Sequence, residues 1–183
     1  MQSVYETDRL ILKILDKSYA GAVLDYYERN RAFLEEWEPT KCEEFYTTSY
    51  HEEQLDKDLT SIESKNALKF WIFKKEESNR IIGSVCFNNI VRGAFLSCHL
   101  GYKLDANEIN KGYMTEAIKK GIEVTFNELG LHRIEANIMP KNKRSLRVSE
   151  KLGFYNEGLA YKYLKINGVW EDHIHMVLLN HRV

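Results

Sequence analysis

The chain has 183 residues, of which 44% are hydrophobic and 12% aromatic, and its formal net charge is −1 at pH 7. This length favours one sizeable domain, and the composition excludes global disorder. No apolar run approaches the roughly 20 residues of a membrane span, and MQSVYETDRL lacks the regions of a secretory signal. Cys42, Cys86 and Cys98 are odd in number and lack CxxC spacing. We therefore expect a cytoplasmic protein without a disulfide framework, a zinc site or a membrane partner.

The charged residues are unevenly distributed despite the small net charge. Residues 28–58 contain ten carboxylates and four basic side chains, whereas residues 131–165 contain eight basic and three acidic ones. This pattern fits two solvated faces as well as it fits an acidic wall for a cationic substrate and a basic wall for a phosphorylated ligand. The basic residues are not interleaved with an aromatic platform, so we expect no direct nucleic-acid partner.

The first half of the chain predicts a strand, three helices and a meander. RLILKIL (9–15) has strand character, and Asp16 is a typical N-cap for a helix that runs to about Asn30. AFLEEWEP predicts a short helix that stops at Pro39, and residues 48–64 predict a third helix. LKFWIFK, IIGSVCFNNI and AFLSCHLGYKL predict antiparallel strands, with hairpin turns at EESNR and VRG.

The second half predicts a helix, a strand, a short helix and a hairpin. Apolar residues recur at helical spacing over residues 113–129, and Gly130 is a typical C-terminal stop. RIEANIM predicts a strand, and NKRSLRVSEKLG predicts a short helix. FYNEGLAYKYLKI and VWEDHIHMVLL predict a hairpin whose Asn167-Gly168 pair is typical of a type I′ turn. This order predicts one α+β domain over residues 1–183.

NEINKGYMTEA (107–117) places a glycine where a strand gives way to a helix. A helix N-terminus has unpaired N–H groups and a partial positive charge, which together form an anion site. Gly112 would let a ligand approach the backbone, and Lys111 adds a charge. The GxxxxGK[ST] and GxGxxG phosphate motifs are both absent, so this local pattern is weak when taken alone.

A longer pattern is more specific. GYKLDANEINKGYMTEA followed by LHRIEANIMPKNKRSLRVSEKLGFYNEG resembles the GNAT superfamily of acyl-CoA-dependent N-acetyltransferases, and within it the ribosomal-protein N-terminal acetyltransferases. The likeness extends in order from TDRLILK to the terminal hairpin. It implies a mostly antiparallel mixed sheet of about seven strands flanked by helices. It also implies acetyl-CoA as cosubstrate with no metal, direct attack in a ternary complex and, by analogy with relatives, a homodimer.

The resemblance implies a coenzyme A site at the entry of the helix over residues 113–129. Backbone amides of the entry loop would wrap the pyrophosphate, and the residues at these positions are Ile109, Asn110, Lys111, Gly112, Tyr113 and Met114. Of the family pattern Q/R-x-x-G-x-G/A, the loop keeps the middle glycine. The preceding strand would splay from its neighbour and pair with the pantetheine arm through Tyr102, Lys103 and Leu104. Asn142 is expected to contact the cofactor too, although it is equally typical of a helix N-cap.

Acetyl transfer requires a neutral amine, a hydrogen-bond donor for the oxyanion and a proton for the departing thiolate. A backbone N–H of the splayed strand near residues 102–104 would serve the oxyanion. The resemblance implies Ser145 of the N-x-x-S motif as the proton donor, because Ser149 stands where many members have a tyrosine. No general base is evident. His99 on the strand beside the expected thioester is the first candidate, and a hydrogen-bonded core histidine is the alternative.

The acceptor side is expected to combine the early helices with the terminal hairpin. The candidates for cradling a cationic amine are Glu35, Glu36, Trp37 and Tyr46. Such residues also form ordinary solvated faces. His173 and His175 share one strand face with Glu171, which suggests zinc, but no further ligand is in sight and no metal is predicted.

The expected acceptor is the N-terminal α-amino group of a protein. An α-amino group has a pKa of about 7.7–8.0 and is appreciably neutral at pH 7, whereas a lysine side chain at about 10.4 is nearly all protonated. A weak or water-relayed base therefore suits the α-amine better. Because this fold serves many acceptors, a small cationic amine such as a polyamine or an aminoglycoside stays open, as does a CoA-binding module without turnover.

Overall fold

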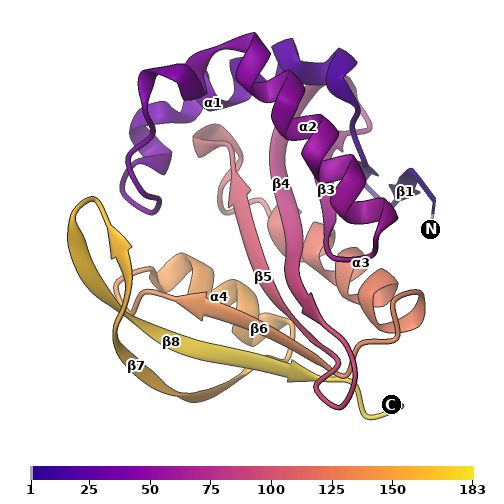
Figure 1. The fold of residues 1–183 in the computed structure, drawn as a ribbon, viewed down its shortest axis with the longest axis vertical. Helices are drawn as coiled ribbons and strands as arrows, with labels where there is room; N and C mark the ends of the chain where they lie inside the picture. Colours follow the sequence, from indigo (N-terminus) through magenta and orange to yellow (C-terminus); the bar gives the residue numbers. More distant parts are fainter. Residues whose placement is uncertain (1) are drawn as a thin grey trace.

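The structure is a computed structural model that describes residues 2–183. One sheet runs through it in the order β1-β2-β3-β4-β5-β6-β8-β7 (Figure 1). The strands are β1 (Val4–Glu6), β2 (Leu10–Lys13), β3 (Leu68–Lys74), β4 (Glu77–Val91), β5 (Ser97–Leu104), β6 (Arg133–Ile138), β7 (Tyr155–Ile166) and β8 (Val169–Leu179). Neighbours are antiparallel except for β5 and β6, which are parallel. The predicted mixed sheet is confirmed, with eight strands instead of about seven, because the three-residue β1 is too short to leave a pattern.

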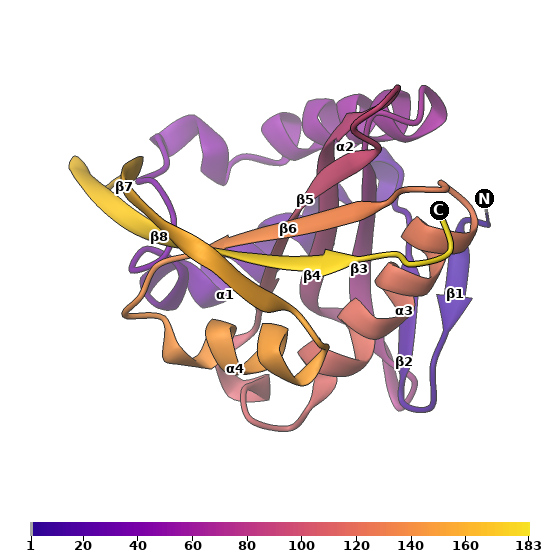
Figure 2. The same cartoon turned by 90° about the horizontal axis from the view of Figure 1, so that it is seen from below.

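Four helices cover the sheet. They are α1 (Ala20–Leu34), α2 (Thr48–Glu63), α3 (Tyr113–Asn127) and α4 (Lys143–Lys151). Helix α3 packs on β2 to β5 and α4 packs on β6, whereas α1 contacts β4 and α2 contacts β3. Figure 2 shows α3 and α4 on one side of the sheet and α2 on the other. Within the described chain, no helix is both long and apolar enough to cross a membrane.

Alternation of side chains along the strands produces two cores. On β3, Phe70 and Ile72 point into the core beneath α3 and α4. Their neighbours Trp71 and Phe73 point into the core beneath α1. The run LKFWIFK is apolar almost throughout because both of its faces are buried.

The helix boundaries in the first third of the chain differ from the prediction. Asp16 caps a single 3₁₀ turn (Lys17–Tyr19), and α1 then continues without a break to Leu34. The prediction of one helix ending near Asn30 and a second over AFLEEWEP is therefore wrong. Asn30 stays inside α1 because its Nδ2 donates to the Tyr26 carbonyl at 2.9 Å.

The later elements follow the sequence pattern more closely. Helices α2 and α3 begin at the predicted residues, although α3 ends at Asn127, two residues before the predicted end. The turn at EESNR is shorter than predicted, because β4 already begins at Glu77. Asn167 and Gly168 have φ values of 49° and 83°, as a type I′ turn requires, and the terminal hairpin is confirmed.

His51 of α2 is a buried histidine that couples stability to pH. It is 2% exposed, its ring stacks on Tyr27, and its Nε2 has no hydrogen-bond partner in the described chain. Burial, aided by the charge of Lys69, lowers the pKa of His51 to about 4. The unfolded chain binds this proton near pH 6.5, so stability falls as the pH drops from about 6.5 to about 4, by up to about 3 kcal/mol.

We expect His51→Phe to reduce this acid sensitivity, because phenylalanine fills the aromatic site and has no proton to bind. The measurement is the free energy of unfolding in urea at pH 7 and pH 4.5 for the wild type and the variant. The wild type should lose more stability between the two pH values than the variant does. Equal losses would show that His51 does not control this acid sensitivity.

Candidate active site

The sheet opens between its two parallel strands. Pairing between β5 and β6 covers only Ser97–His99 with Arg133–Glu135. Beyond that point the two strands diverge, as Figure 1 shows. β4 continues to pair with β5 up to Leu104, and β8 pairs with β6 up to Ile138. The facing edges of β5 and β6 thus lack a strand partner in the described chain, and their backbone groups can bind a ligand.

A cavity of about 680 Å³ occupies this opening. From the α3 and α4 side it is lined by Tyr102, Met114 and Ser145, among others, and from the α1 side by Tyr27, Trp37 and Lys103. The cavity therefore passes through the sheet from one face to the other. All three predicted strand residues, Tyr102, Lys103 and Leu104, line it.

Helix α3 begins at the cavity with an open N-terminus. Gly112 is its N-cap in the left-handed conformation (φ 83°, ψ −2°), and no side chain caps the helix. The first hydrogen bond of the helix runs from the Glu116 N–H to the Gly112 carbonyl at 3.1 Å. The N–H groups of residues 113–115 therefore have no acceptor within the helix. Arg9 Nη1 donates to the Lys111 carbonyl at 3.0 Å and fixes the turn. Unpaired amides and the helix dipole together make this end an anion site.

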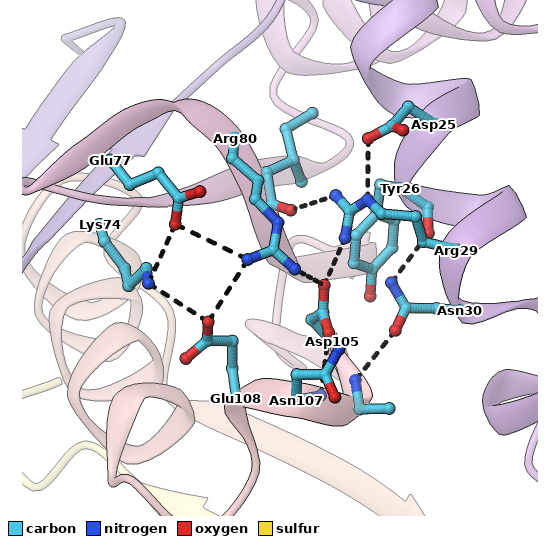
Figure 3. Close-up of polar contacts among 12 residues, drawn as sticks. Asp25, Tyr26, Arg29, Asn30, Lys74, Glu77, Arg80, Asp105, Asn107 and Glu108 are labelled. Atoms are coloured by element: carbon cyan, nitrogen blue, oxygen red, sulfur yellow. Dashed lines mark hydrogen bonds and ion pairs between the residues drawn. The ribbon is translucent and has the colours of Figure 1, made fainter.

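A network of buried charges fixes the loop before α3 to the rest of the fold (Figure 3). The buried Asp105 accepts hydrogen bonds from Arg29 of α1 and from Arg80 of β4, the latter at 2.9 Å. Burial raises the pKa of Asp105, but hydrogen bonds from Asn107 and Asn30 and the charges of both arginines outweigh it, so the pKa lies below its ordinary value. Asp105 therefore stays ionised and links α1 to the loop.

Glu108 is the second buried carboxylate of this network. It pairs with Lys74 at 3.3 Å and with Lys111 at 2.9 Å. The Lys111 ammonium is therefore turned toward Glu108, and Lys111 does not line the cavity, nor does Tyr113. The other predicted loop residues, Ile109, Asn110, Gly112 and Met114, do line it. A backbone contact of Lys111 and Tyr113 with the cofactor stays a prediction.

Two hydroxyls meet on the α4 side of the cavity. Ser145 Oγ donates to Tyr102 Oη at 2.6 Å, and Tyr102 Oη donates to the Ser145 carbonyl at 3.0 Å. Burial raises the pKa of Tyr102 to about 12, so its hydroxyl stays protonated at neutral pH. Ser145 therefore presents a hydroxyl on the α4 wall of the cavity, where Tyr102 holds it in place.

Asn142 and Ser149 lie at the start and near the end of α4. Asn142 is the N-cap, with Oδ1 accepting from the Ser145 N–H at 3.1 Å, and it also lines the cavity. The N-cap alternative is thus confirmed, and contact with the cofactor stays a prediction. Ser149 is buried and donates to the Leu146 carbonyl at 2.8 Å, away from the cavity lining.

The α1 side of the cavity contains an ion pair. Lys103 Nζ lies 2.5 Å from Glu38 Oε1 and 3.4 Å from the Tyr27 hydroxyl. Burial lowers the pKa of Lys103, but Tyr27 and the Glu38 carboxylate outweigh it, and the net pKa is raised. Lys103 therefore stays charged. Of the predicted acceptor residues, Trp37 lines the cavity beside this pair.

The remaining predicted acceptor residues lie outside the cavity lining. Glu35 pairs with Arg31 at 3.2 Å, and the Arg31 guanidinium lies 4.2 Å from the centre of the Tyr46 ring. Glu36 is exposed. These are the contacts of a solvated face, and a role of Glu35, Glu36 and Tyr46 in acceptor binding stays a prediction.

His99 lies where β5 and β6 still pair, and it does not line the cavity. Its Nδ1 is 3.1 Å from Asn89 Nδ2, and its Nε2 is 3.7 Å from Glu135 Oε1. His99 is thus hydrogen-bonded, as the alternative predicted, but it is not a core residue, because 41% of its side chain is exposed. Catalysis by His99 stays a prediction.

The sequence did not predict several of the residues that line the cavity, chiefly Glu38, Asn137 and His173. The only signal for His173 in the sequence is its spacing to Glu171 and His175. Alternation along a strand shows which side chains share a face but not what that face covers. Within residues 2–183 no group of three or more His, Cys, Asp and Glu side chains is arranged to hold a metal ion.

Comparison with known proteins agrees with this geometry. Residues 9–155 match the family described as the acetyltransferase (GNAT) domain. The chain is 39% identical over 168 residues to the ribosomal protein uS5-alanine N-acetyltransferase of Escherichia coli (strain K12), covering 92% of this chain and 86% of that protein. It is 38% identical over 171 residues to the probable N-acetyltransferase YjcK of Bacillus subtilis (strain 168), covering 93% and 94%.

Solved structures show the same fold. The ribosomal-protein-S5-alanine acetyltransferase from Vibrio fischeri has a TM-score of 0.93 at 36% identity, covering 98% of each chain. Mycobacterium smegmatis RimJ in complex with CoA-disulfide has a TM-score of 0.87 at 25% identity, covering 95% of this chain and 83% of that one. The chain therefore belongs to the GNAT family and is an acetyl-CoA-dependent N-acetyltransferase.

Proposed function

We propose that the protein acetylates the N-terminal α-amino group of a protein, by direct attack of the amine on acetyl-CoA in a ternary complex. The cavity that passes through the sheet carries this proposal. Acetyl-CoA would occupy the α3 and α4 side and the amine the α1 side, so the two would meet where β5 and β6 part. Relatives named for acetylating alanine of a ribosomal protein support the choice of acceptor.

The α3 side offers complementary groups along its length. The pyrophosphate would rest on the backbone N–H groups of residues 109–114, and the pantetheine arm would lie along residues 102–104 with Asn142 nearby. Three basic side chains of α4 also line the cavity, namely Arg144, Arg147 and Lys151. The Arg144 guanidinium lies 5.3 Å from the centre of the Phe33 ring of α1. Arg147 and Lys151 would therefore offset the negative charge of the phosphates.

The charge of the cavity favours an α-amine over a polyamine. Among its described lining residues there is one carboxylate, Glu38, against five basic side chains: Lys69, Lys103, Arg144, Arg147 and Lys151. A polycation would gain little attraction here. On the α1 side Lys103 is paired with Glu38 and Lys69 with Asp58, so no described lining carboxylate is left unpaired for a polycation. An α-amine near 7.7–8.0 is neutral far more readily than a lysine at about 10.4.

Ser145 is the proposed proton donor to the departing thiolate. Its hydroxyl lines the cavity beside the unpaired edge of β5, and Tyr102 holds it in place. The thiolate would take the Ser145 proton as the carbon–sulfur bond breaks, and a proton lost by the attacking nitrogen would replace it. The oxyanion would accept a hydrogen bond from a free backbone N–H of residues 102–104.

An acyl-enzyme route would require a reactive nucleophile, and Cys86 is the thiol that lines the cavity. Burial raises the pKa of Cys86, so the thiol stays protonated and is a poor nucleophile. We therefore expect Cys86→Ala to retain kcat within about threefold. Steady-state kinetics with both substrates varied tests this expectation. A loss of more than tenfold, with an acetylated enzyme detected by mass spectrometry, would support the acyl-enzyme route instead.

The acceptor is tested with a peptide that begins with alanine and contains one internal lysine. After incubation with acetyl-CoA, tandem mass spectrometry locates the acetyl group, which we expect on the α-amine. The matched controls are the same peptide with a formylated N-terminus and the polyamine spermidine, both of which should react poorly. Acetylation of spermidine alone would indicate the small-amine alternative. Binding of acetyl-CoA with no transfer to any acceptor would indicate a binding module without turnover.

The homodimer and the cytoplasmic location stay predictions. Light scattering on the purified protein tests the first, and fractionation of source cells tests the second. A monomer at micromolar concentration would contradict the dimer without affecting the proposed reaction.

A further inference from the structure

We propose that His173 is the general base that takes the proton from the acceptor amine, an inference that rests on the proposed function. His173 lies on β8, points to the same face as His175, and lines the cavity. His175 is the register partner of Asn137 on β6, which also lines the cavity. The pairing of β6 with β8 ends at Ile138 and Ile174. His173, the next residue of β8, therefore lies beyond the end of β6, beside the open part of the sheet.

The hydrogen bonds of His173 determine which ring nitrogen can accept a proton. Nδ1 lies 3.0 Å from the carbonyl oxygen of Glu171. A carbonyl can only accept, so Nδ1 carries the hydrogen, and Nε2 of the neutral ring has a free lone pair. None of the hydrogen bonds among the described residues engages this Nε2. The ring is therefore held in the tautomer that a general base requires.

His173 is also shielded from bulk water yet reachable from the cavity. The residue is 3% exposed, and it is one of the residues that line the cavity. His175 differs in both respects. Its Nδ1 is 2.8 Å from Glu135 Oε1, and its Nε2 is sealed inside the protein without a partner in the described chain. Of the two histidines, His173 can meet a substrate directly.

The titratable groups around His173 leave its Nε2 free. On its own strand, Glu171 pairs with Lys141 at 2.6 Å, and His175 pairs with Glu135. The Tyr163 ring of β7 packs against the imidazole with 5.6 Å between ring centres. Across the cavity Lys103 is paired with Glu38. Each charged neighbour thus has its own partner, and none of them occupies the site of proton transfer.

The proposed step balances protons and bonds. His173 Nε2 removes one proton from the acceptor ammonium and passes it to solvent. The neutral amine forms a carbon–nitrogen bond with the thioester carbonyl, and the carbon–sulfur bond then breaks. The second proton lost by the nitrogen replaces the one that Ser145 donates to the thiolate. The products are the N-acetylated peptide, the CoA thiol and one released proton.

His173→Asn is a matched test, because the asparagine amide can keep the hydrogen bond to the Glu171 carbonyl while the basic nitrogen is lost. At pH 7 we expect kcat/KM for the alanine-initiated peptide to fall about 100-fold, within the range for loss of a general base. The dissociation constant of acetyl-CoA should stay unchanged. Near pH 9.5 the α-amine is neutral without help, so the deficit should shrink to less than about tenfold.

Three results would overturn the inference while leaving the proposed function intact. The first is a full rate for His173→Asn at pH 7, and the second is a deficit that stays the same at all pH values. In the third, His99→Gln shows the pH-dependent deficit and His173→Asn does not. If the wild type binds acetyl-CoA but leaves the α-amine unmodified, the proposed function fails first and the inference fails with it.

Discussion

Replacing Gly112 with aspartate is expected to weaken acetyl-CoA binding at least 100-fold. The added carboxylate would stand beside the amides that we propose bind the pyrophosphate. At about 4 Å and an effective dielectric constant near 20, two like charges repel by about 4 kcal/mol. Crowding is not the cause, because a Cβ at Gly112 would have only Arg9 Nη2 nearby, at 3.4 Å.

Gly112→Asn is the control that separates charge from conformation. Asparagine and aspartate have nearly the same shape, and both tolerate the left-handed conformation at φ 83° better than other side chains do. Calorimetric titration with acetyl-CoA should find a modest loss for asparagine and a severe one for aspartate. Equal losses would assign the effect to backbone strain. Unchanged affinity in both variants would mean that the pyrophosphate does not rest at this helix.

The second large effect is expected for Ser145→Ala. Loss of the proposed proton donor should lower kcat about 100-fold while leaving the dissociation constant of acetyl-CoA nearly unchanged. Tyr102→Phe should lower kcat less, because the role that we propose for Tyr102 is to orient the serine and not to donate to the thiolate. In the double variant the loss should equal that of Ser145→Ala alone, since the two hydroxyls act through one hydrogen bond.

Steady-state kinetics of the three variants, together with calorimetry, measures these effects. Unaltered kcat in Ser145→Ala would remove the serine from the mechanism. An additive loss in the double variant would give Tyr102 an independent role, such as donating directly to the thiolate with its own proton.

The features that could be predicted from the sequence are local in the chain. Gly112 follows a strand and precedes an amphipathic helix within a few residues, and the loop pattern that carries the family resemblance is equally short. Helix α3 and the terminal hairpin depend on spacing over neighbouring residues, and both were confirmed. The prediction that the first helix ends near Asn30 was wrong. A polar residue at the end of an apolar pattern also fits inside a helix when its side chain forms a hydrogen bond to the preceding turn.

The features that could not be predicted depend on contacts between distant segments. Asp105 and Glu108 look like ordinary loop residues in DANEIN, yet they are buried by partners on α1, β3 and β4. The last strand, β8, inserts between β6 and β7 in the sheet. That insertion brings His173 to the cavity wall, and no spacing within VWEDHIHMVLL indicates it. The position of His99 outside the cavity likewise follows from where β5 and β6 stop pairing.

We propose that one cavity receives acetyl-CoA from one face of the sheet and the amine from the other. A conjugate tests it most directly, with the N-terminal nitrogen of an alanine-initiated peptide joined through an acetyl bridge to the sulfur of CoA. We expect this conjugate to compete with both acetyl-CoA and the peptide, and to bind at least 10-fold more tightly than CoA, because linkage makes the second contact intramolecular. A conjugate that competes with acetyl-CoA alone, and binds no more tightly than CoA, would contradict the shared cavity.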